Sequence, residues 1–316
     1  MRFEFYSEAL ADVPKLSVDG TVDNSIHFSH WEGNTTPAEV KADTSTEIAL
    51  NLVASPHYST LTNNIELVTN NHFDADGVLS VWTVLNGERA LEYRDLLVSA
   101  AEAGDFSEHT SDDGVRVSIV IQGSDQAGSN NDTPPPLAGW LAGREVDDAR
   151  AYELVLPEVK KLLDDVNAYE SLWREGWDQV AAALESFARG ESRVVEYSGI
   201  SLITLAPGLI NPTMAVAKHA KGELFLIATP ARGGWSYRLD YPYYSWAETV
   251  VRPRIARRDL SHALSLLNQK EEIGNGWKTD DREMTSAAKF FDGRGELGVS
   301  RLQPDEVVAV LSECTT

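Results

Sequence analysis

Residues 65–80 read IELVTNNHFDADGVLS, and this stretch decides the fold class. The apolar run that ends at Thr69 predicts a strand, the polar residues after it predict a turn, and the segment from Val78 to about Leu85 predicts a helix. Strands that alternate with helices in this way are typical of a parallel sheet with helices on both faces. We therefore expect an α/β fold.

The segments on either side repeat this alternation. Residues 25–29 have the pattern of a short strand, and Thr44 with Glu47 has capping-box spacing, which predicts the start of a helix. Apolar residues recur at helical spacing over residues 88–103. The β-branched run over residues 115–121 predicts one more strand.

The rest of the chain divides into two further parts. Residues 123–136, GSDQAGSNNDTPPP, lack apolar anchors and indicate a linker. A strongly helical segment follows, and strand patterns begin at Arg193. We predict a metal-binding α/β domain over residues 1–125, a linker and helical connector over residues 126–192, and a smaller α+β domain for the substrate over residues 193–316.

Composition narrows the class of partner. The chain has 316 residues with 27 Lys and Arg against 49 Asp and Glu, a formal net charge of −22. This balance argues against binding to long nucleic acid or to an anionic membrane, because both need an excess of cations. No stretch approaches the about 20 apolar residues of a membrane span, and Cys314 is the single cysteine. We expect a cytoplasmic protein with a small anionic substrate, and a homodimer stays open.

The turn after residues 65–69 carries metal-ligand residue types at alternate positions. His72, Asp74 and Asp76 can converge on one ion, because residues two apart in an extended chain point the same way. Imidazole with carboxylates suits Mn²⁺, Fe²⁺ or Zn²⁺ better than Ca²⁺. The alternative is that Asp74 and Asp76 cap the helix and His72 is an ordinary turn residue.

A second turn with candidate ligands follows residues 25–29. His30 lies there, and the capped helix after Thr44 comes next. If the two strands are neighbours, both turns lie at one edge of the sheet, and two ions about 3.5–4 Å apart could act together at phosphorus. The alternative is that His30 is a surface turn residue, since a lone histidine is more often structural than a ligand.

These two segments resemble motifs of the DHH phosphoesterases. His72-Phe-Asp74-Ala-Asp76-Gly77 is similar to their His-x-Asp-x-Asp-Gly motif, and also to a turn in a group of bacterial proteins. Ser29-His30-Trp31-Glu-Gly-Asn34 is similar to a degenerate Asp-His-His-x-x-Asn motif, with Ser29 and Trp31 in place of an aspartate and a histidine. The order of the two motifs is reversed, which a circular permutation would explain.

The resemblance implies a set of site residues. It implies metal binding by His72, Asp74 and Asp76, with His30 from the opposite turn, and catalytic roles for His30 and Asp76. A further ligand would be Asp105 or Asp125, and Asp105 is preferred because Asp125 lies in the linker-like run. Asp43 is another candidate ligand, although it can equally cap the following helix. Asn34 would bind substrate.

Arginines would complete a phosphoryl site. Residues 252–258, RPRIARR, form the densest basic run, and we assign Arg252 and Arg254 to the substrate. The alternative is that they pair with the excess carboxylates at the surface.

The sequence thus favours a divalent-metal-dependent hydrolase, a phosphoesterase for a small phosphorylated or nucleotide-like substrate. Mn²⁺ is the favoured ion, with Mg²⁺, Fe²⁺ or Zn²⁺ as alternatives. Two other functions stay open: a metal-dependent hydrolase of a non-phosphate bond, and a catalytically degenerate protein that binds a nucleotide or a partner.

Overall fold

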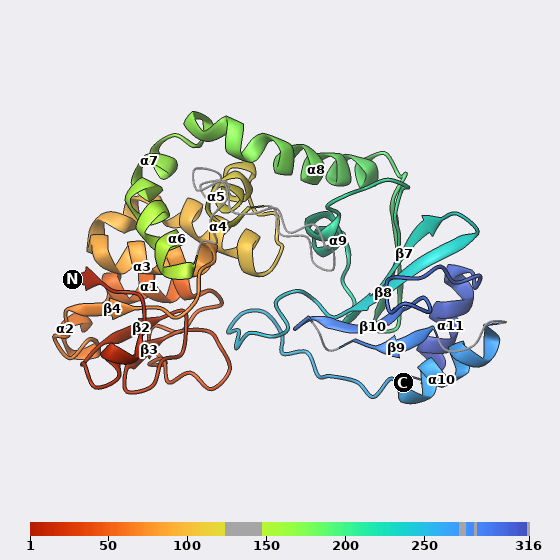
Figure 1. Ribbon diagram of the computed structural model, residues 1–316, viewed down its shortest axis with the longest axis horizontal. Helices are drawn as coiled ribbons and strands as arrows, with labels where there is room; N and C mark the ends of the chain where they lie inside the picture. Colours follow the sequence, from red (N-terminus) through yellow and green to blue (C-terminus); the bar gives the residue numbers. More distant parts are fainter. Residues whose placement is uncertain (124–146, 272–275, 281–282, 315–316) are drawn as a thin grey trace. The chain divides into compact units, whose positions relative to one another are not determined.

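The computed structural model describes residues 1–123, 147–271, 276–280 and 283–314 (Figure 1). The chain forms two compact units, one of residues 1–178 with 246–253, the other of residues 179–245 with 254–316. Most of the predicted linker lies outside the described residues, and the three-part division at residues 125 and 192 stays a prediction. None of the described helices has the length and apolar character needed to cross a membrane.

A four-stranded sheet forms the centre of the first unit. Its strands run in the order β1 (Arg2–Phe3), β4 (Leu67–Thr69), β2 (Leu16–Val18) and β3 (Ile26–Phe28). Every neighbouring pair is parallel, so the carboxyl ends of the strands lie at one edge. This arrangement confirms the parallel sheet of an α/β fold.

Two helices start at this edge and pack against each other and the sheet. In α1 (Ser45–Ala54), the side chain of Thr44 accepts a hydrogen bond from the backbone N–H of Glu47, as the capping-box spacing predicts. In α3 (Ala75–Asn86), the Asp74 carboxylate accepts one from Gly77. The structure also describes in this unit the helices α2 (Tyr58–Leu61), α4 (Arg94–Asp105), α5 (Asp112–Gln122), α6 (Asp148–Val155) and α7 (Val159–Asp164), with 3₁₀ turns at Glu8–Leu10, Gly87–Tyr93, Leu156–Glu158 and Val166–Tyr169.

The strand predicted over residues 115–121 is wrong, because this segment belongs to helix α5. Ser111 caps the helix by accepting a hydrogen bond from Gly114. A Cβ on Gly114 would lie 2.1 Å from Ser99 Oγ on α4, so only glycine allows the two helices to approach this closely. Close packing on α4 outweighs the strand preference of the valines and isoleucines.

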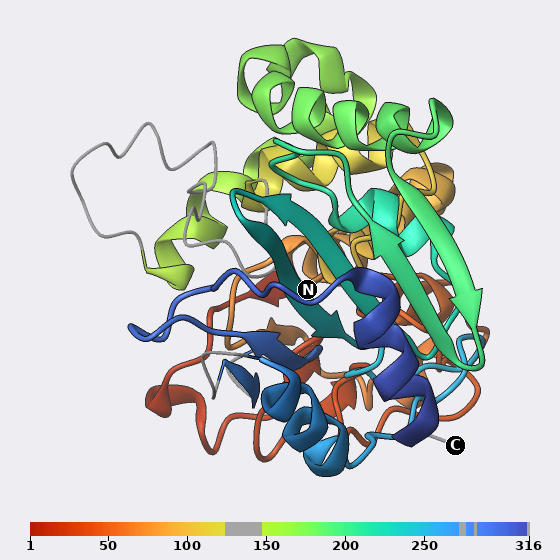
Figure 2. The ribbon, with the colours of Figure 1, turned by 90° about the vertical axis from the view of Figure 1, so that its right-hand side faces the viewer.

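The second unit is built on a mixed six-stranded sheet, turned toward the viewer in Figure 2. Among the described strands of this sheet, only β6 and β7 pair in parallel, which agrees with the expected α+β character. Helix α8 (Glu170–Ala188) runs from the first unit into the second. In sheet order the strands are β5 (Arg193–Tyr197), β6 (Ile200–Thr204), β7 (Leu224–Ala231), β8 (Gly234–Asp240), β10 (Ser286–Phe290) and β9 (Trp277–Thr279), and the helices are α9 (Thr213–His219), α10 (Ser261–Lys270) and α11 (Pro304–Cys314).

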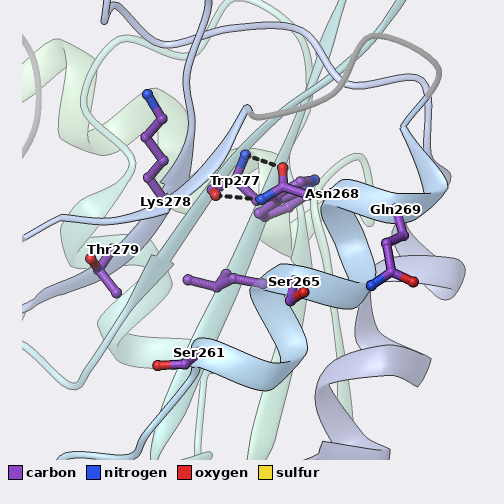
Figure 3. Close-up of a pocket in the computed structure, with 8 residues that line it drawn as sticks. Ser261, Ser265, Asn268, Gln269, Trp277, Lys278 and Thr279 are labelled. Atoms are coloured by element: carbon purple, nitrogen blue, oxygen red, sulfur yellow. Dashed lines mark hydrogen bonds between the residues drawn. The ribbon is translucent and has the colours of Figure 1, made fainter.

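An open hollow of about 700 Å³ lies beside α10 and β9 of this unit (Figure 3). The Asn268 side chain joins the two elements, since it hydrogen-bonds both the N–H and the carbonyl of Trp277. Among the described residues that line the hollow, Lys278 is the one charged side chain, and none is an acid, a histidine or a cysteine. The described lining residues therefore do not include the groups that a metal-dependent reaction needs.

Candidate metal centre

The site residues gather where the parallel strands of the first unit end. Asp19 directly follows β2, His30 lies two residues after β3, and His72 lies three residues after β4. The strands before the two sequence-predicted turns, β3 and β4, are not direct neighbours, because β2 lies between them and pairs in parallel with both. The two turns still lie at one edge of the sheet, since all three strands run in the same direction. Side chains at this edge of an open parallel sheet are placed to bind ligands.

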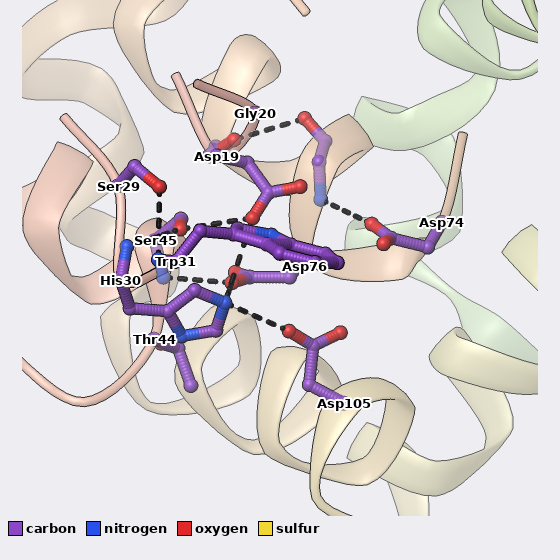
Figure 4. A network of polar contacts seen from close by, with 12 residues as sticks. Asp19, Gly20, Ser29, His30, Trp31, Thr44, Ser45, Asp74, Asp76 and Asp105 are labelled. Atoms are coloured by element: carbon purple, nitrogen blue, oxygen red, sulfur yellow. Dashed lines mark hydrogen bonds and ion pairs between the residues drawn. The ribbon is translucent and has the colours of Figure 1, made fainter. Parts of the chain in front are cut away.

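The first group of candidate ligands consists of Asp19, His30, Asp76 and Asp105 (Figure 4). Nε2 of His30 lies 3.2 Å from Asp105 Oδ2, 3.6 Å from Asp19 Oδ1 and 3.7 Å from Asp76 Oδ2. The four ligand atoms all lie within 4.8 Å of one another. One imidazole and three carboxylates thus surround one small volume.

The second group consists of Asp19, His72 and Asp74. Nε2 of His72 lies 2.8 Å from Asp19 Oδ2 and 3.1 Å from Asp74 Oδ2. Asp19 is therefore shared, with Oδ1 facing the first histidine and Oδ2 facing the second. A carboxylate between two ligand groups is suited to bridge two ions.

Both histidines are fixed through Nδ1, and Nε2 of each ring faces the carboxylates of its ligand group. His30 Nδ1 donates to the backbone carbonyl of Asp43 at 2.7 Å, and His72 Nδ1 donates to Asn71 Oδ1 at 2.9 Å. Within the described residues, Nε2 of each ring is buried and makes no hydrogen bond of regular geometry. A fixed Nδ1–H and an unshared Nε2 lone pair are the usual state of a metal-ligating histidine. The two groups can therefore hold metal ions.

The carboxylates are fixed by further hydrogen bonds. Asp76 accepts from the backbone N–H groups of Ser45 and Thr46, both at 2.7 Å, at the start of α1. The Ser45 hydroxyl donates to Asp19 Oδ1 at 2.9 Å. Capping and metal binding are thus compatible, since each carboxylate oxygen has a second lone pair.

In the absence of a metal ion, the close carboxylates and histidines of the two ligand groups shift each other's pKa values. Burial raises the pKa of Asp19, but the charge of His72 outweighs burial and lowers it to about 2. Burial lowers the pKa of His30, but the contact with Asp105 and the charge of Asp76 raise it to about 10. The pKa of His72 rises to about 12, because the effect of Asp19 outweighs burial. Burial and the charge of Asp19 raise the pKa of Asp76 to about 6.

Metal binding should therefore release protons. At pH 7 each histidine carries on Nε2 the proton that an ion must displace, so we expect at least one proton released per ion. The affinity for Mn²⁺ should rise about tenfold per pH unit for each released proton. Calorimetry in buffers of different ionisation enthalpy measures the release. A Kd that is constant between pH 6 and pH 9 would contradict this assignment of ligands.

Comparison with known proteins places the chain in a family. A family of unknown function, DUF6687, matches residues 1–314. The chain belongs to the DUF6687 family. One solved structure that resembles it is a pGpG-specific phosphodiesterase, PggH from Vibrio cholerae, with a TM-score of 0.35 and 11% sequence identity over 95% of this chain and 82% of that chain. No curated protein matches this DUF6687 chain.

Asp43 lies outside both ligand groups of this DUF6687 member. Its backbone carbonyl holds His30, while its carboxylate accepts hydrogen bonds from the N–H groups of Val250, Val251 and Arg252. Burial raises the pKa of Asp43, but these hydrogen bonds outweigh burial and lower it. Asp43 thus connects residues 246–253, here called the strap, to the His30 ring.

The three candidate substrate residues also lie outside both groups. Arg252 forms ion pairs with Asp43, Glu102 and Glu108 at 2.6–2.7 Å. The Asn34 amide donates to the Trp31 carbonyl at 2.8 Å and to a carboxylate of the strap at 2.7 Å. Arg254 belongs to the second unit. Their substrate roles stay predictions, and Asp125 lies outside the described residues.

Asp19 is the site residue that the sequence reasoning missed. The signal is the short buried run Leu16–Val18, followed directly by Asp19 and Gly20. Asp19 adopts a φ of 63°, an uncommon conformation that aspartate tolerates better than most residues. A Cβ on Gly20 would lie 2.1 Å from Asn71 Oδ1, so glycine lets the turns after β2 and β4 meet.

Proposed function

We propose that this chain is a divalent-metal-dependent phosphoesterase that acts on a small phosphorylated or nucleotide-like substrate. The observation that carries the proposal is the Asp19 carboxylate, which presents one oxygen to each of two ligand groups that both contain a histidine. Two adjacent ions suit displacement at phosphorus, where both the attacking and the leaving oxygen need stabilisation. The resemblance to the DHH phosphoesterases is part of this proposal.

The ligand chemistry favours Mn²⁺. Each group combines one imidazole with two or three carboxylates and contains no thiolate. Mixed nitrogen and oxygen ligands suit Mn²⁺ or Fe²⁺, whereas Mg²⁺ prefers oxygen and retains several waters. His30, Asp76 and Asp105 would hold one ion, His72 and Asp74 the other, and Asp19 both.

A bound divalent ion would lower the pKa of a water molecule and offset the charge of the phosphoryl group. The residues of the chain orient the groups that would hold the ions. The Asp43 carbonyl and Asn71 fix the two imidazoles, and the N-terminus of α1 fixes Asp76. We propose His30 as a ligand rather than a general acid, because its ring is fully buried among three carboxylates.

The charge of the chain supports a small substrate. With a net charge of −22, attraction for an anion has to come from the ions rather than from the surface as a whole. A cytoplasmic location and a small anionic substrate are part of the proposal.

Hydrolysis of bis(p-nitrophenyl) phosphate tests the proposal. We expect turnover with Mn²⁺, loss of turnover with excess chelator, and recovery when Mn²⁺ is restored. Asp76→Asn should lower the rate by about 100-fold, while Asp113→Asn, an exposed acid on α5, should leave it unchanged. Protein that binds Mn²⁺ but hydrolyses p-nitrophenyl acetate and not the phosphodiester would overturn the phosphoesterase assignment.

A further inference from the structure

Two tryptophans contact the histidines of the proposed metal centre. Trp246 in the strap packs edge-on against His30, with ring centroids 4.9 Å apart. Trp31 packs edge-on against His72 at 5.4 Å. The two indoles contact each other at 4.7 Å, and this Trp31–Trp246 pair therefore reaches both ligand groups.

The Trp31–Trp246 pair has ring surface and a hydrogen-bond donor that a ligand could contact. Both side chains are only partly buried. The indole Nε1 of Trp31, in contrast, is buried and has no hydrogen-bond partner within the described residues. A buried donor without a partner is costly, and such a donor beside a ligand site indicates that a ligand accepts its hydrogen bond. Figure 4 shows the Trp31 indole among the acids of the centre.

Polar contacts hold the pair in place without a ligand. The backbone N–H of Glu248 donates to the His30 carbonyl at 2.7 Å, and the Asp43 carboxylate binds the backbone of residues 250–252. The strap is thus fixed on both sides of the turn that carries Trp31. A rigid pair loses little conformational entropy when it binds a flat ring.

We propose that the Trp31–Trp246 pair binds the nucleobase of a nucleotide whose phosphate lies at the metal centre. This inference rests on the proposed phosphoesterase function and names its substrate class. An ion site next to partly exposed indole rings suits a ligand that is anionic at one end and planar and aromatic at the other. Nucleotides combine these features, and stacking on tryptophan tolerates every base because each has a π-face.

Binding of adenosine 5′-monophosphate and of inorganic phosphate to the Mn²⁺-loaded full chain tests the proposal by calorimetry. The nucleotide should bind about 5- to 100-fold more tightly than phosphate. Trp31→Leu and Trp246→Leu should remove most of this difference and leave phosphate binding unchanged. Trp31→Phe keeps an aromatic ring and should retain most of the difference in affinity between nucleotide and phosphate.

Trp177→Leu is the matched control, because Trp177 is a partly buried tryptophan of the same unit that stacks on Arg116. It should bind both ligands as the unmodified chain does. The Mn²⁺ content of each variant shows whether the centre is intact, and Trp246→Leu serves if Trp31→Leu loses metal.

Equal affinities for nucleotide and phosphate in the unmodified chain would overturn the proposal. So would a Trp31→Leu variant with full Mn²⁺ content that binds the nucleotide as tightly as before. The proposed hydrolysis can fail separately, because the titrations need no turnover. Tight nucleotide binding without phosphodiester hydrolysis would refute only the enzymatic function, and hydrolysis without preference for the nucleotide would refute only the stacking site.

Discussion

Asp19→Asn is expected to remove most of the bound Mn²⁺ and to lower phosphodiester hydrolysis by about 100-fold or more. Asp19 is the one described residue shared by both ligand groups, so its charge stabilises both ions. Asparagine keeps the size of the side chain and an acceptor for the Ser45 hydroxyl. It also tolerates the φ of 63°, so the backbone should not change.

Metal content by mass spectrometry and the initial rate of hydrolysis measure this effect. Asp23→Asn is the matched control, because Asp23 is an exposed aspartate only four residues away. The control should keep full Mn²⁺ content and full rate. An Asp19→Asn variant with two ions per chain would exclude Asp19 as the shared ligand.

The second large effect is expected at Arg252. Its guanidinium pairs with Asp43, Glu102 and Glu108, and its side chain is only 17% exposed. Arg252→Met would leave three partly buried carboxylates without their cation, which should lower the free energy of unfolding of the first unit by about 3–5 kcal/mol. The strap would also lose a contact to Asp43, the residue that holds His30.

Thermal unfolding of the metal-free protein measures the loss. Arg150→Met is the control, because Arg150 is an exposed residue of α6 whose surface pair with Glu153 contributes at most about 1 kcal/mol. The stability of Arg252→Lys should lie between those of Arg252→Met and Arg150→Met. The lysine ammonium keeps the positive charge but lacks the planar guanidinium that contacts several carboxylates at once. Equal stability of Arg252→Met and Arg150→Met would show that the strap is not held by these ion pairs.

The sequence predicts the centre of the site better than its surroundings. The pattern after β4 and the capped helix α1 are local signals, and they place His72, Asp74, Asp76 and His30 at one sheet edge. Strands β2, β3 and β4 all have three residues. The turns after β3 and β4 contain histidines, whereas the turn after β2 contains none, so Asp19 lacks that signal.

Other features depend on contacts between distant residues. The pairing of Asp43 with Arg252 joins positions 209 residues apart, which spacing in one sequence cannot reveal. The sequence alone indicates that Arg252 is a cation available for substrate, whereas the fold surrounds it with three acids. Helix α5 likewise depends on its packing against α4, because its β-branched residues by themselves favour a strand.

Anomalous diffraction from crystals grown with Mn²⁺ tests the central claim most directly. We predict two manganese peaks about 3.5–4 Å apart, one beside Nε2 of His30 and one beside Nε2 of His72, with the Asp19 carboxylate between them. A single peak, or peaks that contact neither histidine, would contradict the two-ion centre and the phosphoesterase function built on it.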